Sequence, residues 1–212
     1  MATPFRRALS HAVGWAADRR VPAFLRAPLY RGYARATGAD LGEIRLPLTA
    51  FPSLGQFFVR ELKDGARPIE RAPDALVSPV DGTVQAIDPV ARGTVLQAKG
   101  RAYAVDELLG GLRGEVELEG GTAWTIYLSP RDYHRIHAPE DVRVEEIAWL
   151  PGDRYSVQPK VLARRQVLSI NERVVLRLAS AHGPCFLVLV GALNVGRMRV
   201  VGVEPTARRT LS

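Results

Sequence analysis

Two apolar runs in the C-terminal third of the sequence decide the fold: RVVLRLAS (173–180) and CFLVLVGAL (185–193). Both are rich in β-branched and large apolar residues, and Gly and Pro break the sequence between them, as is typical of strands joined by a turn. We therefore predict a compact, mostly antiparallel β core, sandwich-like or barrel-like. The prediction is supported by further runs of the same kind, found from about residue 76 onward: GTVQAI (82–87), GTVLQA (93–98), GTAWTIYLS (121–129), VRVEEIAWL (142–150) and RMRVVGV (197–203).

Helices are predicted ahead of this core, which makes the expected fold class α+β. Ser53 and Gln56 form a capping-box pattern that opens a short helix over SLGQFFVREL (53–62). Another short helix, AVDELLG (104–110), interrupts the strands and ends at a glycine suited to a C-terminal cap. Because the pattern changes from helix-like to strand-like at about residue 50, we expect a helical part over residues 1–50 and a β-rich part over residues 51–212.

The first 45 residues carry eight arginines against three acidic residues, within a chain of net charge +7. Basic amphipathic helices favour an anionic lipid surface, although two solvated helices packed on the domain fit the pattern equally well. Charge alone also permits nucleic-acid binding, but no recognised module supports it, so we expect no nucleic-acid partner. The apolar residues at helical spacing fall in two stretches: Phe5, Leu9, Ala12, Val13 and Ala16, beside Arg6 and Arg7, and then Phe24, Leu25, Leu29 and Tyr33.

Composition limits the possible settings of the protein. A chain of 212 residues with 47% hydrophobic content can bury a full core. Its single cysteine, Cys185, cannot form an internal disulfide and lies in an apolar run, where we expect a buried small side chain. No apolar run reaches the roughly 18 residues needed to span a bilayer, and the N-terminal region lacks a clean signal-peptide pattern. We expect a cytoplasmic protein, held peripherally on the inner face of the cell membrane.

The stretch YLSPRDYHRIHAP (127–139) places His134 and His137 three residues apart in a chain with four histidines. A histidine pair can transfer protons, bind zinc or pack in a core. Proton transfer works best with a carboxylate that orients the imidazole. The best candidate is Asp81 in SPVDGTV (78–84), although Asp-Gly is also a common turn element. Zinc would need a third ligand, and no nearby motif supplies one. Asp132 could equally be a turn carboxylate.

Several segments, taken in order, resemble the phosphatidylserine decarboxylase family, over roughly residues 50–203. The resemblance implies a lyase that converts phosphatidylserine to phosphatidylethanolamine and carbon dioxide, using a pyruvoyl group made from one of its own serines by self-cleavage at a Gly-Ser bond. The segments that carry the resemblance are FFVRELKDGARPI (57–69), SPVDGTV (78–84), LQAKGRAYAVDELLG (96–110), YLSPRDYHRIHAP (127–139), NERVV (171–175) and VGALNVGRM (190–198).

The resemblance also assigns roles to residues. Asp81 is the orienting acid and His137 the base that activates the serine for self-cleavage, while His134 assists decarboxylation without any metal. A basic side chain, Arg60, Lys63 or Arg135, is expected to hold the lipid phosphate. The implied partners are phosphatidylserine, an anionic membrane and an α chain that carries the pyruvoyl group; the sequence leaves a homodimer open.

One part of the family pattern is missing from this sequence. The family cleaves itself at approximately Leu-Gly-Ser-Thr, downstream of the segment matched by VGALNVGRM, whereas none of the eight serines here follows a glycine. We therefore interpret the chain as a proenzyme truncated before that site, or nearly a β chain alone, and expect it to be inactive by itself. Ser212 is not expected to form the pyruvoyl group. The alternatives are a catalytically silent membrane-associated homologue and a zinc hydrolase that uses His134 and His137.

Overall fold

The computed structural model describes residues 12–72, 74–97, 101–206 and 208–210. Two compact units can be recognised in it. The first, here called the sheet unit, contains the described residues of Val84–Tyr127 and Asp141–Ser212. The second, here called the helical unit, contains Ala12–Thr83 and Leu128–Glu140, so its chain is interrupted by part of the sheet unit. The predicted helix positions Phe5 and Leu9 and the serine Ser212 lie outside the described residues.

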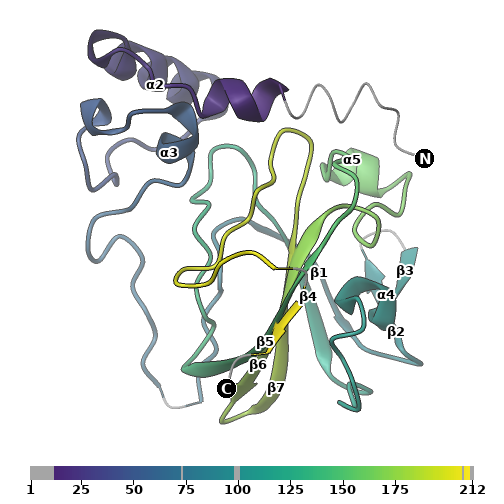
Figure 1. Ribbon diagram of the computed structural model, residues 1–212. Coiled ribbons are helices and arrows are strands. Elements are labelled where there is room, and N and C mark those ends of the chain that lie inside the picture. Colours follow the sequence, from purple (N-terminus) through teal and green to yellow (C-terminus); the bar gives the residue numbers. More distant parts are fainter. Residues whose placement is uncertain (1–11, 73, 98–100, 207, 211–212) are drawn as a thin grey trace. The chain divides into compact units, whose positions relative to one another are not determined.

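The sheet unit is built around a four-stranded antiparallel sheet with the order β7-β6-β5-β8 (Figure 1). A two-stranded antiparallel sheet joins β2 to β3, and another two-stranded sheet joins β1 to β4. The short helices α4 and α5 belong to the same unit. The bounds of these elements are β1 Thr83–Pro89, β2 Thr94–Gln97, β3 Arg101–Ala104, α4 Val105–Leu109, β4 Thr122–Tyr127, β5 Val142–Leu150, α5 Pro159–Leu162, β6 Arg173–Ser180, β7 Gly183–Val190 and β8 Arg208–Thr210.

Strand β6 carries buried apolar side chains on both faces because both faces of the sheet are covered. Val174, Leu176 and Leu178 belong to one hydrophobic cluster, whereas Val175 on the opposite face packs in another. All four side chains are less than 9% exposed. Burial on both faces explains the apolar residues of RVVLRLAS. Arg173 at its start is also buried, and its guanidinium donates to backbone carbonyls. The α+β class with mostly antiparallel sheets is therefore confirmed, although the sheets are not closed into a barrel.

The sequence RMRVVGV (197–203) was predicted as a strand, and that prediction is wrong. Arg197 and Gly202 have left-handed φ values of 56° and 73°, and Val201 is 98% exposed. The backbone N–H of Val203 donates to the carbonyl of Val200, which closes a turn. Conversely, β3 was not foreseen. Cys185, expected to be buried, is partly buried against the cluster that contains Val174, Leu176 and Leu178.

The helical unit begins with helical residues 12–17 and continues with α2 (Ala23–Thr37), η1 (Leu48–Ala50) and α3 (Leu54–Phe58). Gly38 ends α2 in the left-handed conformation, as expected of a helix C-terminal cap. Tyr30 and Phe57 stack with ring centroids 4.6 Å apart, and Phe51 meets Phe57 edge-on. These aromatic rings form the core of the unit. The division of roles between residues 1–50 and 51–212 stays a prediction.

Helix α3 starts where the sequence predicts but ends sooner. The Ser53 side chain accepts a hydrogen bond from the backbone N–H of Gln56, which confirms the predicted N-terminal cap. The helix stops at Phe58 and not at Leu62. The reason is that Leu62 forms an antiparallel bridge with Ile44, flanked by backbone hydrogen bonds from Arg45 to Glu61 and from Lys63 to Glu43. This bridge places Glu43 beside the segment that leads to Arg67.

Candidate active site

The histidine segment is held inside the helical unit by hydrogen bonds from helix and loop residues. The Tyr33 hydroxyl donates to the Pro130 carbonyl at 2.8 Å, and Arg60 Nη2 donates to the Arg131 carbonyl at 3.1 Å. On the other side of the segment, the backbone N–H of His137 donates to Pro79 at 2.9 Å. The last contact joins the histidine segment to SPVDG. The two motifs singled out in the sequence are therefore adjacent in space.

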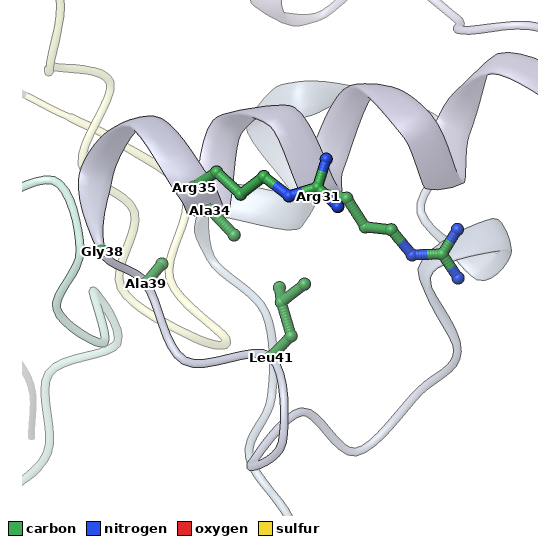
Figure 2. A pocket seen from close by; sticks show the side chains of 6 residues that line it. All are labelled: Arg31, Ala34, Arg35, Gly38, Ala39 and Leu41. Atoms are coloured by element: carbon green, nitrogen blue, oxygen red, sulfur yellow. The ribbon is translucent and has the colours of Figure 1, made fainter.

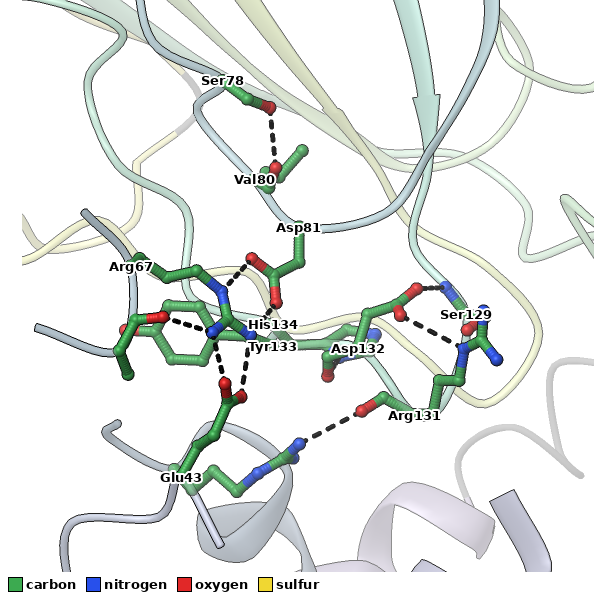
Figure 3. A network of polar contacts seen from close by, with 12 residues as sticks. Glu43, Arg67, Ser78, Val80, Asp81, Ser129, Arg131, Asp132, Tyr133 and His134 are labelled. Carbon is green, nitrogen blue, oxygen red and sulfur yellow. Dashed lines mark hydrogen bonds and ion pairs between the residues drawn. The ribbon is translucent and has the colours of Figure 1, made fainter. Parts of the chain in front are cut away.

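Asp81 is bound by Arg67 through two parallel hydrogen bonds (Figure 3). Nε of Arg67 donates to Oδ1 at 2.8 Å and Nη2 to Oδ2 at 2.7 Å. The Arg67 guanidinium lowers the pKa of the Asp81 carboxyl, and the backbone N–H of Tyr133 and the charge of Arg60 lower it further, against a desolvation effect that raises it. Asp81 is therefore ionised well below neutral pH.

Arg67 itself lies between two carboxylates. Its Nη1 and Nη2 donate to the two oxygens of Glu43 at 2.9 and 3.0 Å, and Nη1 also donates to the carbonyl of Ala66. Together with the two bonds to Asp81, these contacts use all five N–H groups of the guanidinium. Figure 3 shows the guanidinium between the Asp81 and Glu43 side chains. Here we call these three side chains the carboxylate clamp.

His134 is a partly buried and neutral imidazole. Its Nδ1 lies 2.9 Å from the backbone carbonyl of Asp132. Since a carbonyl can only accept, Nδ1 carries the proton and Nε2 is left with a lone pair. The ring also contacts Phe58, with centroids 3.9 Å apart. Burial lowers the pKa of His134, and the Asp132 carbonyl only partly opposes this shift. His134 can therefore offer a lone pair at Nε2 at neutral pH.

His137 is paired with Tyr133 and not directly with Asp81. Its Nε2 lies 3.1 Å from the Tyr133 hydroxyl, and the two rings stack at an interplanar angle of 21°. In the described part of the chain, the side-chain partner of Asp81 is Arg67. A direct hydrogen bond between Asp81 and His137 is thus not formed in this structure. A contact after a modest rearrangement stays a prediction, because the backbone bond from His137 to Pro79 already brings the two segments together.

Tyr133 and Arg67 were missed by sequence reasoning. Tyr133 is 9% exposed and touches both predicted relay residues, Asp81 through its backbone and His137 through its hydroxyl. Its place within YLSPRDYHRIHAP was the available signal. Asp132, by contrast, closes a turn, since its Oδ2 accepts from the backbone N–H of Ser129 at 2.6 Å.

The three basic candidates for a lipid phosphate differ in their surroundings. Lys63 donates to the Gly42 carbonyl at 2.6 Å, and Arg135 is paired with Glu61 at 2.9 Å. Arg60 is 3% exposed, and its Nε and Nη1 have no hydrogen-bond partner in the described structure. It borders a cavity of about 150 Å³ that Asp81 also lines. With Arg60, the carboxylate clamp reaches a formal charge of zero.

A second hollow, of about 460 Å³, lies beside the C-terminal half of α2 (Figure 2). Arg31 and Arg35 line it together with Ala34 and Leu41. On the same helix Phe24 is 79% exposed, and Leu25 and Leu29 are each 45% exposed. The helix therefore presents apolar and basic side chains to its surroundings, as the sequence predicted. No helix in the described ranges is both long enough and apolar enough to cross a membrane.

Comparison with known proteins identifies the family. A model of the phosphatidylserine decarboxylase family matches residues 54–209. The chain belongs to this family. It is 41% identical over 202 residues to the phosphatidylserine decarboxylase proenzyme of Myxococcus xanthus, which covers 95% of this chain and 72% of the relative. Proenzymes of the same name from Alkalilimnicola ehrlichii and Pseudomonas aeruginosa are each 40% identical, and the chain spans 68% of either one.

The phosphatidylserine decarboxylase match includes most of the candidate site. Arg67, Asp81, Tyr133, His134 and His137 all lie within residues 54–209, whereas Glu43 and α2 precede that range. The family resemblance predicted from the motifs is thereby confirmed, and the family is one of decarboxylases. The word proenzyme in the relatives' names indicates processing of the relatives' chains.

Proposed function

We propose that this chain is the acid-base part of a phosphatidylserine decarboxylase, an enzyme that converts phosphatidylserine to phosphatidylethanolamine and carbon dioxide. The observation that carries the proposal is the gathering of Asp81, Tyr133, His134 and His137 within one compact unit of a chain that belongs to this family. An ionised carboxylate close to an imidazole is the arrangement that general-base catalysis requires.

Each residue has a distinct part in this proposal. His137 takes the proton of the serine hydroxyl during self-cleavage, and Asp81 stabilises the imidazolium that forms. His134, neutral and with its Nε2 lone pair free of the Asp132 carbonyl, holds or moves a proton at the substrate. Tyr133 keeps the His137 ring in place by stacking and by its hydroxyl. A pyruvoyl group, when present, supplies the carbonyl that takes up the electron pair left by carbon dioxide.

The residues of this chain fit the proton-moving half of the chemistry and not the formation of the pyruvoyl group. No serine in the sequence follows a glycine. Two serines near the site have structural roles: Ser53 caps α3, and the Ser78 hydroxyl donates to the Val80 carbonyl at 2.7 Å. The hydroxyl of Ser129, in the histidine segment, is buried without a hydrogen-bond partner in the described structure, but Ser129 follows a leucine and not a glycine. We therefore propose that the chain alone is inactive and works with an α chain that carries the pyruvoyl group. A catalytically silent homologue is the second candidate, and the missing Gly-Ser pair favours it.

For the lipid phosphate we propose a basic side chain among Arg60, Lys63 and Arg135. Arg60 has the strongest case, because its buried Nε and Nη1 have no hydrogen-bond partner among the described residues. Buried donors without partners cost free energy, so a phosphate or carboxylate oxygen at this position would be stabilised. Lys63 and Arg135 are exposed and would act at the mouth of the site. Each of the three can be neutralised in turn in a chain that carries the self-cleavage segment. The residue that binds the phosphate is the one whose loss raises the KM for phosphatidylserine most.

For location we propose a peripheral position on the cytoplasmic face of an anionic membrane. The exposed Phe24, Leu25 and Leu29 would enter the lipid interface, while Arg31 and Arg35 face acidic headgroups. A homodimer on this surface stays a prediction. The zinc alternative requires a third ligand beside the two histidines, and among the described residues no group of three or more His, Cys, Asp and Glu side chains is arranged to hold a metal ion.

The decisive experiment extends the chain beyond residue 212 with a segment that carries Leu-Gly-Ser-Thr. We expect the extended chain to cleave itself between Gly and Ser, and His137→Ala to abolish cleavage while leaving the protein folded. The matched control is His182→Ala, which removes an exposed histidine of the sheet unit. If His137→Ala cleaved as fast as the parent, the proposed role of the relay would be wrong. If the extended chain stayed intact although folded, the silent homologue would be favoured, and zinc found by elemental analysis would favour the hydrolase.

A further inference from the structure

We infer that Arg67, anchored by Glu43, is a positioning residue that fixes the orientation of Asp81 for the relay. This inference rests on the proposed function, because Asp81 is the carboxylate of the proposed relay. It adds two residues to the machinery, one of which, Glu43, lies outside the part of the chain matched by the family.

The geometry of the clamp leaves little freedom to the Asp81 carboxylate. Two hydrogen bonds of 2.8 and 2.7 Å hold both oxygens of the carboxylate and so restrict its rotation, which a single-point contact could not do. Arg67 is in turn held by two bonds to Glu43 and one to its neighbouring carbonyl. A planar group with all its donors engaged cannot rotate without breaking several bonds at once. Glu43 therefore fixes the position of Arg67, and Arg67 in turn fixes the orientation of Asp81.

The clamp also leaves Asp81 capable of a further contact. Each carboxylate oxygen has two lone pairs, and Arg67 uses one on each oxygen. The backbone N–H of Tyr133 takes part of the remaining capacity. An imidazole N–H can still approach, so His137 need not displace Arg67 in order to pair with Asp81. Arg67 thus acts on catalysis through Asp81 and does not compete with the base.

The charges around Asp81 determine what removal of Arg67 would do. The groups that face Asp81 are Arg67 from the loop after Leu62, Arg60 from the end of α3, and Tyr133 from the histidine segment; Glu43 acts behind Arg67. Without Arg67, Asp81 and Glu43 would be two carboxylates near one remaining guanidinium, Arg60. Like charges raise each other's pKa, so Asp81 would then be protonated at a higher pH.

The test compares three variants with a matched control in the 212-residue chain. Arg67→Met removes both the positive charge and the two-point hydrogen bonding to Asp81. Arg67→Lys keeps the charge alone. Glu43→Gln weakens the bonds that hold Arg67 on its other side. The control is Arg45→Met, because Arg45 belongs to the same bridged segment but, among the described residues, its ion pair is with Glu61, at 3.4 Å. The titration midpoint of the Asp81 carboxyl is measured by carbon-13 NMR, and thermal unfolding confirms that each variant is folded.

We expect the Asp81 midpoint to move upward strongly in Arg67→Met, less in Arg67→Lys, and not at all in Arg45→Met. In Glu43→Gln, which removes a like charge and leaves Arg67 to Asp81 alone, we expect the midpoint to fall. An unchanged midpoint in folded Arg67→Met would overturn the inference. Should Arg67→Met fail to fold, an unchanged midpoint in folded Arg67→Lys would overturn it equally. This readout needs no Gly-Ser site, so it separates failure of the clamp from failure of the proposed function.

The positioning role is tested in the chain extended with Leu-Gly-Ser-Thr. Arg67→Lys should slow self-cleavage on the order of ten- to a hundredfold at every pH, because orientation is lost while charge remains. Arg67→Met should in addition move the acid limb of the pH–rate profile to higher pH. If both variants cleaved at the parental rate and with the parental profile, Arg67 would have no positioning role. If His137→Ala also cleaved at the parental rate, the proposed relay of Asp81 and His137 would be wrong, and not only the role of Arg67.

Discussion

The hydroxyl of Tyr133 lies 3.1 Å from Nε2 of His137, and the same residue presents its backbone N–H to Asp81. One residue therefore contacts both members of the proposed relay. We expect Tyr133→Phe to keep the ring stacking and lose only the hydrogen bond. In the extended chain it should slow self-cleavage roughly tenfold, since a single neutral hydrogen bond contributes about 0.5–1.5 kcal/mol. The rate of self-cleavage would be measured from quenched time courses on denaturing gels. A parental rate would show that the hydroxyl is dispensable.

His134 makes stability depend on pH. Its pKa in the folded state is lowered by burial, so the unfolded chain binds a proton at a higher pH than the folded chain does. Unfolding free energy should therefore be unaffected by His134 well above pH 6.5 and should fall as the pH drops below this value, until the folded-state pKa is reached. His134→Gln should remove this part of the dependence, as measured by urea unfolding between pH 5 and 8. The same slope in both proteins would contradict the argument.

Membrane binding should depend on the exposed apolar side of α2. Phe24→Ser should weaken binding to phosphatidylglycerol vesicles by on the order of tenfold, because burying a phenylalanine in an apolar phase contributes about 1.5–3 kcal/mol. Added salt should weaken it further by screening the arginines. Val201→Ser is the matched control, since Val201 is 98% exposed in the other unit. Point variants are preferable to removing residues 1–45, because Tyr30 and Ile44 pack in the core. Equal losses in both variants would argue against α2.

The unextended chain should form no phosphatidylethanolamine. Asp81, His134 and His137 can move protons, but none of them can accept the electron pair left by carbon dioxide. The purified protein should run as one intact band and should not react with hydrazines, as judged by mass spectrometry. Spontaneous cleavage together with formation of phosphatidylethanolamine would contradict this prediction and would show that one of the eight serines forms a pyruvoyl group.

Stability of the sheet unit should depend on Gly110, which ends α4 with a φ of 59°. A Cβ at this position would collide with the Leu150 side chain. Gly110→Ala should therefore cost both the left-handed strain and the overpacking, together roughly 2–4 kcal/mol of unfolding free energy. Gly111→Ala is the control, because its φ of 85° is also left-handed but a Cβ there meets nothing within 4 Å. Equal losses, measured by chemical denaturation, would eliminate the collision as a cause.

Patterns local in sequence predicted most of the fold. The runs RVVLRLAS and VRVEEIAWL coincide with β6 and β5, because both are rich in the β-branched and large apolar residues that pack in the hydrophobic clusters of the sheet unit. RMRVVGV failed because β-branched composition does not reveal a left-handed residue inside the run. Likewise, α3 ended early because Leu62 pairs with Ile44, and that partner lies outside any local window.

The site was predictable only in part, for the same reason. The motifs indicated that Asp81 belongs near His137, and the backbone bond from His137 to Pro79 places the two segments together. Nothing in the sequence indicates that Arg67, among the many arginines, lies between Asp81 and Glu43. Choice of an ion-pair partner depends on how distant loops meet, and periodicity carries no information about it.

The interrupted course of the helical unit has a consequence for the order of folding. The Tyr33 hydroxyl and its acceptor, the Pro130 carbonyl, are 97 positions apart, and the Arg60 contact to Arg131 spans 71. Contacts of such large sequence separation carry the entropy of closing a long loop before they form. During synthesis, α2 and α3 leave the ribosome well before the histidine segment exists. The two histidines can therefore join their scaffold only after β1 to β4 have been made, so the acid-base site is assembled late.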